Sequence, residues 1–105
     1  MSNRQTIDRL LELGALPSED KASVDEVQTY QELLHAIEKP VSDDDARKLV
    51  TLFGSGDLYG LPWTLLHLVE SAPGWPLTDC LNDTSNEWIR LMIQRLKNAG
   101  QIPSN

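Results

Sequence analysis

The stretch Gly60-Leu-Pro-Trp-Thr-Leu-Leu-His-Leu-Val-Glu-Ser-Ala-Pro-Gly-Trp-Pro76 predicts the helix around which the rest of the chain packs. Pro62 suits the first turn of a helix, where a missing backbone N–H costs nothing. Apolar residues cover most of the helical wheel, which indicates burial on more than one side. These residues are Leu61, Leu65, Leu66, Leu68 and Val69. Because Ala72-Pro-Gly ends the pattern, we expect a central helix over 61–72 with Leu66 and Leu68 in the core.

Four further helices are predicted around this one from capping residues and from apolar stripes of 3.6-residue period. Ser23-Val-Asp-Glu26 and Thr84-Ser-Asn-Glu87 both have the pattern of a capping box. Ser42 is the expected cap of a third helix, and Thr6 that of the first. The ranges are 5–14, 24–39, 43–53 and 85–98. The expected fold is an all-α bundle of about five helices forming a single helical domain, residues 1–105, with no β-sheet.

Several side chains are assigned to the core of this bundle by their spacing. Val24 begins the expected apolar stripe of the second helix, and Trp63 and Trp88 are expected to pack inside. Trp75, between Gly74 and Pro76, is expected to cover the end of the central helix.

Two helices share a short sequence pattern. Leu33-Leu-His-Ala-Ile-Glu38 and Leu65-Leu-His-Leu-Val-Glu70 match at a separation of 32 residues, a period typical of helical-hairpin repeats. The match covers about six positions that many amphipathic helices would share. Both coincidence and a true repeat of helical hairpins are compatible with it.

Charge is distributed unevenly along the chain. The formal net charge of −7 arises entirely within residues 1–45, where eleven Asp and Glu stand against four Lys and Arg. Such a surface repels nucleic acid, whose backbone is bound through Lys and Arg, and attracts basic proteins. Solubility alone is the alternative explanation. We therefore expect a protein partner, with no binding to DNA or RNA.

Composition indicates a cytoplasmic protein. No apolar run reaches the roughly 18 residues of a transmembrane helix, so no membrane association is expected. The polar start, Met-Ser-Asn-Arg-Gln-Thr, has no apolar segment behind it, so we expect no secretory signal. The single cysteine, Cys80, cannot form a disulfide within the chain, which suits a reducing compartment.

The two histidines and the cysteine are the candidate residues for catalysis or metal binding. His67 lies between Leu66 and Leu68, and we expect it to be a buried or half-buried residue of the core rather than a catalyst. His35 and Glu38, like His67 and Glu70, are three residues apart but lack the further ligands of a metal site. Cys80 has no recognisable catalytic partner. We predict that the protein is not an enzyme and carries no metal or other cofactor.

One segment has a resemblance to known proteins. The run Leu52-Phe-Gly-x-x-Asp57-x-Tyr-Gly-Leu-Pro-Trp-Thr-Leu-Leu-His-Leu-Val-Glu-Ser-Ala-Pro-Gly-Trp-Pro76 resembles small bacterial proteins akin to toxin-immunity proteins of the contact-dependent inhibition type. The resemblance covers about a quarter of the chain and transfers no functional residue. It implies a small helical cytoplasmic protein that binds and neutralises one toxin. Nuclease toxins present Lys- and Arg-rich clefts that carboxylates can occupy.

The predicted partner-binding surface combines an acidic turn with an aromatic anchor. It consists of Asp43, Asp44, Asp45 and Asp57, with Tyr59 beside them. The expected function is that of an immunity-type binding protein whose acidic surface docks on a basic toxin domain. A non-catalytic helical adaptor or scaffold is the alternative. A third hypothesis, an enzyme or metalloprotein using His35 and His67, has less support from the sequence.

Overall fold

The computed structural model describes residues 3–54, 56 and 58–101 and confirms an all-α fold. Five α-helices follow one another along the chain, and no strand occurs in this described part. They are α1 (Asn3–Leu13), α2 (Val24–Ala36), α3 (Asp43–Val50), α4 (Leu61–Glu70) and α5 (Glu87–Asn98). Two short 3₁₀ turns, η1 (Leu58–Gly60) and η2 (Thr78–Cys80), precede and follow α4.

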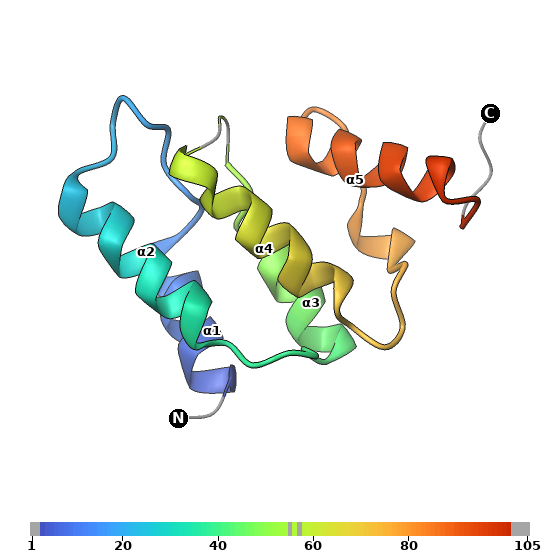
Figure 1. Ribbon diagram of the computed structural model, residues 1–105, viewed down its shortest axis with the longest axis horizontal. Helices are drawn as coiled ribbons and strands as arrows, with labels where there is room; N and C mark the ends of the chain where they lie inside the picture. The colour runs from blue at the N-terminus through green and yellow to red at the C-terminus, as the bar shows by residue number, and fades with distance from the viewer. Residues whose placement is uncertain (1–2, 55, 57, 102–105) are drawn as a thin grey trace.

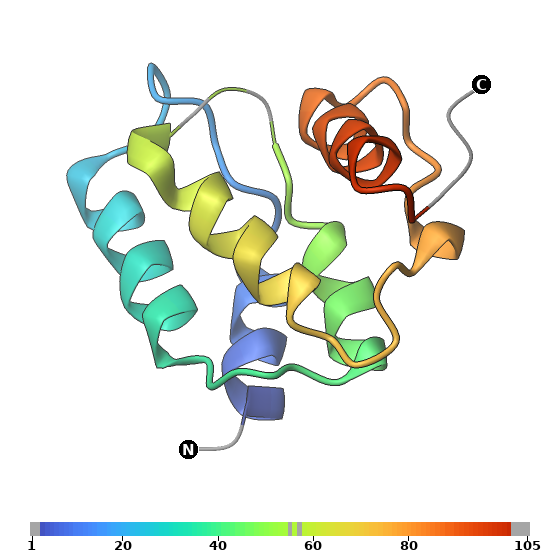
Figure 2. The ribbon, with the colours of Figure 1, turned by 45° about the vertical axis from the view of Figure 1, so that its right-hand side comes forward.

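The first four helices form two hairpins that stack side by side in two layers. Helix α1 packs on α2 and α3 packs on α4, while α1 also contacts α3 and α2 contacts α4 (Figure 1). The shortest extent of the molecule is 17 Å, which corresponds to two helices at the usual separation of about 8–10 Å. Helices α1 and α3 therefore lie in one layer, and α2 and α4 lie in the other. Helix α5 lies beside this four-helix unit and extends it (Figure 2).

Helix α4 is buried on most of its circumference, as predicted from its sequence. Leu66 has no exposed surface and Leu68 is buried with it, so both belong to the core. His67, between them, is exposed, which corrects the expectation of a buried histidine. The reason is helical geometry, since Trp63, His67 and Glu70 share the stripe of α4 that points away from the core. Helix α5 covers this stripe only in part, through its contacts with Trp63 and Glu70.

The sequence match between the second and fourth helices has a counterpart in their burial. Leu34 and Leu66 are both in the core, as are Ile37 and Val69. His35 and His67 are both exposed. The correspondence is partial, because Leu33 is half-buried whereas Leu65 is fully buried, and Ala36 is exposed whereas Leu68 is buried. The two helices therefore share some buried positions and differ at others.

Capping residues determine where the helices begin, with two corrections. Ser23 and Glu26 form the predicted capping box, and Ser42 Oγ accepts a hydrogen bond from Asp45 N at 3.1 Å. Helix α5 begins two residues later than predicted, because Asn86 Oδ1 accepts from Trp88 N at 2.8 Å and replaces Thr84 as the cap. Helix α1 begins at Asn3, so Thr6 is a buried residue within the helix and not its cap.

Four of the predicted helices extend further at their carboxyl ends than the observed ones, including the central helix, which ends at Glu70 and not at residue 72; the helix predicted over 85–98 ends at Asn98 as expected. Helix α2 ends at Ala36 because Ile37 adopts an extended conformation, with ψ of 127°. Helix α3 ends at Val50, followed by turns that lead to Phe53. Helix α1 ends at Leu13, where the hydroxyl of Tyr30 lies 3.2, 3.0 and 3.3 Å from the carbonyl oxygens of Leu13, Gly14 and Ala15. Tyr30 thereby caps α1 from the neighbouring helix.

Helix α5 is attached to the four-helix unit by aromatic packing at one end and an ion pair at the other. The Trp88 ring stacks on Phe53, with centroids 6.1 Å apart, and meets Trp63 edge-on at 5.2 Å. Arg95 binds Glu70 through two hydrogen bonds of 3.0 Å, a geometry that raises the pKa of Arg95. Trp88 is buried as predicted, whereas Trp63 remains 39% exposed because Trp88 covers only part of its surface.

Trp75 is half-buried and packs against the core beyond the end of α4, where its backbone N–H donates to the carbonyl of Ala72. None of the helices in the described ranges has both the length and the apolar character to cross a membrane.

Candidate partner-binding site

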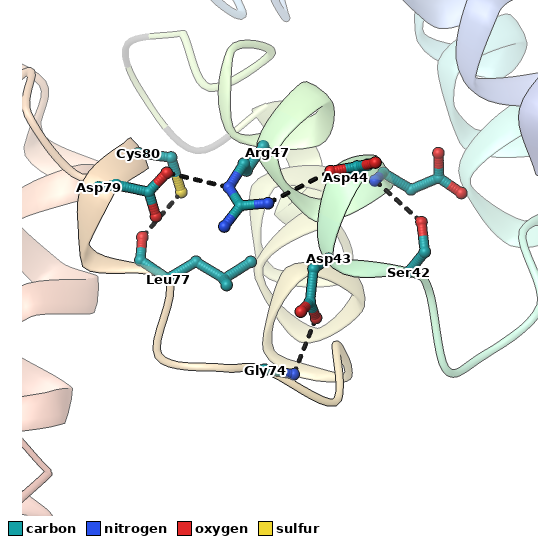
Figure 3. A network of polar contacts seen from close by, with 9 residues as sticks. Ser42, Asp43, Asp44, Arg47, Gly74, Leu77, Asp79 and Cys80 are labelled. Carbon is teal, nitrogen blue, oxygen red and sulfur yellow. Dashed lines mark hydrogen bonds and ion pairs between the residues drawn. The ribbon is translucent and has the colours of Figure 1, made fainter.

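The acidic turn predicted as a binding surface forms the first turn of α3. Asp43, Asp44 and Asp45 follow the cap Ser42, where carboxylates are favoured by the positive end of the helix dipole. Successive helical residues diverge by about 100°, so their side chains separate from one another. Two of the three carboxylates have partners within the protein (Figure 3).

Asp43 ties the start of α3 to the loop that follows α4. Its Oδ1 accepts a hydrogen bond from the backbone N–H of Gly74 at 2.8 Å. A Cβ atom at position 74 would overlap the Asp43 carboxylate, so glycine permits the backbone to approach this closely. Asp43 therefore stabilises the junction between the two elements.

Arg47 holds a second carboxylate of the turn. Its Nη1 lies 3.3 Å from Asp44 Oδ1, and its Nε lies 3.0 Å from Asp79 Oδ2 in η2 (Figure 3). The hydrogen bond and charge of Asp79 are the main reasons that the pKa of Arg47 is raised. One cation thus partly neutralises the predicted acidic surface. Within the described part of the chain, only Asp45 of these three aspartates has no hydrogen-bond or ion-pair partner for its side chain.

Cys80 lies next to this network and behaves as a thiol. Its Sγ donates to the carbonyl oxygen of Leu77 at 3.0 Å, and partial burial, followed by the charge of Asp79, raises its pKa. A raised pKa disfavours the nucleophilic thiolate. Cys80 is half-buried and packs against the core.

Tyr59 is not beside the acidic turn, which corrects the predicted grouping. It immediately precedes α4, whereas Asp43 is bonded to Gly74, beyond the other end of α4. A helix of 10 residues is about 15 Å long, so the two parts of the predicted surface are at opposite ends of it. Asp57, the remaining member of the predicted surface, lies outside the described residues.

The backbone of Tyr59 is unusual for such a large residue. Its φ of 54° is in the left-handed region, where bulky side chains are rare and backbone strain is often associated with function. Glu19 holds this conformation, because its Oε1 accepts from Tyr59 N at 3.1 Å. The residue is 70% exposed. The backbone of an exposed tyrosine is therefore tied to Glu19.

A groove of about 840 Å³ runs along α2 and reaches Tyr59. Val24 and Val27 supply apolar surface, and Gln28, Glu32 and His35 supply polar groups. Val24 is 82% exposed, although it was expected to face inward. It occupies the first turn of α2, whereas the buried residues of this helix, Tyr30 and Leu34, lie further along it. A groove could not be predicted from sequence patterns, although an apolar residue does stand at the start of an acidic helix that has no Lys or Arg.

The charge around the groove is negative. None of the described residues that line it is Lys or Arg, and helix α2 carries Asp25, Glu26 and Glu32 without a Lys or Arg of its own. Glu19, which holds Tyr59, adds another carboxylate at one side. The groove therefore combines apolar surface with carboxylates that attract cations.

Metal ligands were not found grouped together in the described ranges, 3–54, 56 and 58–101. No cluster of three or more His, Cys, Asp or Glu residues is arranged there to hold a metal ion. His35 borders the groove and His67 lies on the exposed stripe of α4.

Comparisons of the chain with protein-family models, curated proteins and solved structures find no match.

Proposed function

We propose that this protein is a non-catalytic, immunity-type binding protein that acts in the bacterial cytoplasm and neutralises a cognate toxin by docking an acidic surface on it. One observation carries the proposal. Between Leu10 and Glu38 the chain has seven carboxylates and a single lysine, Lys21, and all seven carboxylates are exposed. They are Glu12, Glu19, Asp20, Asp25, Glu26, Glu32 and Glu38.

This surface suits a basic protein partner. A protein that acts on nucleic acid needs Lys and Arg in its cleft to bind phosphates. Carboxylates can bind the same side chains through charge-assisted hydrogen bonds and thereby exclude the substrate. Long-range attraction also accelerates the encounter of oppositely charged proteins. Inhibition by such an acidic protein requires a stable scaffold and no chemistry.

The stacked hairpins favour a second candidate, a helical adaptor or scaffold. Helices α1 and α3 lie in one layer and α2 and α4 in the other, an arrangement shared with helical-hairpin repeats. An adaptor of this kind would also bind through α2, but its partner need not be toxic.

The test that separates the two functions is co-expression with the product of the reading frame adjoining the gene. That product, expressed alone in a bacterial host, is expected to arrest growth, and co-expression of this protein is expected to restore it. Purified together, the two proteins are expected to form a complex. A non-toxic neighbour, or toxicity unchanged by co-expression, would contradict the immunity function and favour the adaptor.

A further inference from the structure

The groove along α2 exposes apolar residues that the packing of the described residues does not require. Val24 and Tyr59 are both largely exposed, so they contribute little to the core. Asp43 and Asp44, by contrast, have partners within the protein. We propose that the groove is the docking site for a cationic amphipathic helix of the partner. This inference rests on the proposed function in that it takes the partner to be a basic protein.

The dimensions of the groove fit a helix. The α2 residues that line it run from Val24 to Ala36, a length of about 18 Å at 1.5 Å per residue. A bound helix of about three turns would match this length. In the described part of the chain there is no strand edge to which an extended peptide could be added, whereas an apolar groove beside a helix suits helix-in-groove recognition.

The charge of the groove determines which kind of helix it would hold. Apolar side chains of the occupant would contact Val24, Val27 and Tyr59, and Lys or Arg on its flanks would reach Glu32 and the neighbouring Asp25. A second copy of this chain would bring the same carboxylates together, and each copy carries a net charge of −7. Charge complementarity therefore favours a basic partner over self-association.

Tyr59 is the expected anchor of this site. Tyrosine buries a large surface with little loss of side-chain freedom, which is why it is frequent among the residues that dominate binding. Its backbone N–H is bonded to Glu19, so the backbone that carries the ring is ordered before the partner arrives. A pre-positioned anchor loses less entropy on binding than a mobile one.

The experiment uses the whole protein and synthetic helical peptides of defined composition. Three peptides of about 18 residues are compared: one with Leu on one face and Lys on the other, one with Glu in place of Lys, and one with Ser in place of Leu. Binding is followed by backbone amide chemical shifts at low salt. We expect the Leu/Lys peptide to shift the amides of α2 and Tyr59 and to bind at least tenfold more tightly than the other two.

Two variants and a matched control locate the site. Glu32→Lys reverses one charge in the groove, and Tyr59→Asn removes the ring while keeping a residue that tolerates positive φ. Each is expected to weaken binding of the Leu/Lys peptide at least fivefold. Asp83→Lys, which changes the net charge as much as Glu32→Lys but precedes α5, is expected to change it less than twofold.

Several results would overturn the groove as the docking site. One is a set of amide shifts centred on the Asp43–Asp45 turn. Others are equal weakening of peptide binding by Asp83→Lys and Glu32→Lys, or self-association of the protein through α2, detected by sedimentation. An adjoining toxin that is still neutralised by Glu32→Lys and Tyr59→Asn would also overturn it, while leaving the immunity function intact. Failure of the wild-type protein to neutralise that toxin would instead count against the proposed function.

Discussion

Replacing Asp43 by alanine should destabilise the fold, although this residue was predicted to bind a partner. Its carboxylate accepts a hydrogen bond of 2.8 Å from Gly74 N, and it also lies in the first turn of α3. A hydrogen bond to a charged group contributes about 1.5–3 kcal/mol, and a carboxylate at a helix N-terminus about 0.3–1 kcal/mol. Because Asp43 is partly exposed, we expect values near the lower ends and a total loss of about 2 kcal/mol.

Urea unfolding followed by tryptophan fluorescence and by circular dichroism measures this loss. Asp45→Ala is the matched control, because Asp45 belongs to the same turn but its side chain has no partner among the described residues. It is expected to lose only the interaction with the helix dipole, about 0.3–1 kcal/mol. Equal free energies of unfolding for Asp43→Ala and Asp45→Ala would refute the assigned role of the Gly74 contact.

Three further changes test the packing and the histidine assignment. Leu66→Ala should lower the free energy of unfolding by about 2–5 kcal/mol in a urea titration, because Leu66 is fully buried in α4 and its removal leaves a cavity; a loss below about 1 kcal/mol would contradict its core position. Tyr30→Phe should cost about 1 kcal/mol at neutral pH through the lost cap of α1. Burial, followed by the charge of Glu26, raises the pKa of Tyr30, so the tyrosine of the unfolded chain loses its proton at a lower pH than that of the folded protein. The stability advantage of tyrosine over phenylalanine should therefore shrink as pH rises above about 10. Urea midpoints of both proteins at neutral and alkaline pH measure this advantage, and a difference that stays constant with pH would contradict the prediction. His67→Ala should remain folded and keep its partner affinity in titration calorimetry, because His67 is exposed on α4; loss of binding by a folded variant would assign His67 to the site.

The helices could be predicted from sequence because local signals agree with burial. The capping box Ser23–Glu26, the cap Ser42 and the proline at position 62 each correspond to an observed helix start. The start of α5 was predicted two residues too early, because Thr84 and Asn86 are both suitable cap residues. Asn86 is the observed cap and accepts two backbone hydrogen bonds. Which of the two caps the helix depends on the path of the preceding loop, which sequence patterns do not describe.

The exposure of individual residues was harder to predict. His67 lies between two leucines, Trp63 belongs to the most apolar helix, and Val24 begins a predicted apolar stripe, yet all three are exposed. Which face remains uncovered depends on the crossing of α2 and α4, a tertiary feature. The same limit applies to the binding site, since the partner of Asp43 is Gly74, 31 positions away. Arg47, which pairs with Asp44, is also held by Asp79, 32 positions further along the chain.

The most direct test of an acidic docking surface is the salt dependence of association with the adjoining toxin, measured by stopped-flow at about 50 and 300 mM salt. We predict that the association rate constant of the wild-type protein falls at least tenfold between the two conditions, because salt screens the attraction between exposed charges. A variant with Asp25→Asn and Glu32→Gln should associate more slowly at low salt and depend less on salt, whereas Asp44→Asn with Asp45→Asn should retain most of the wild-type rate. An association rate that is the same at both salt concentrations would contradict the account.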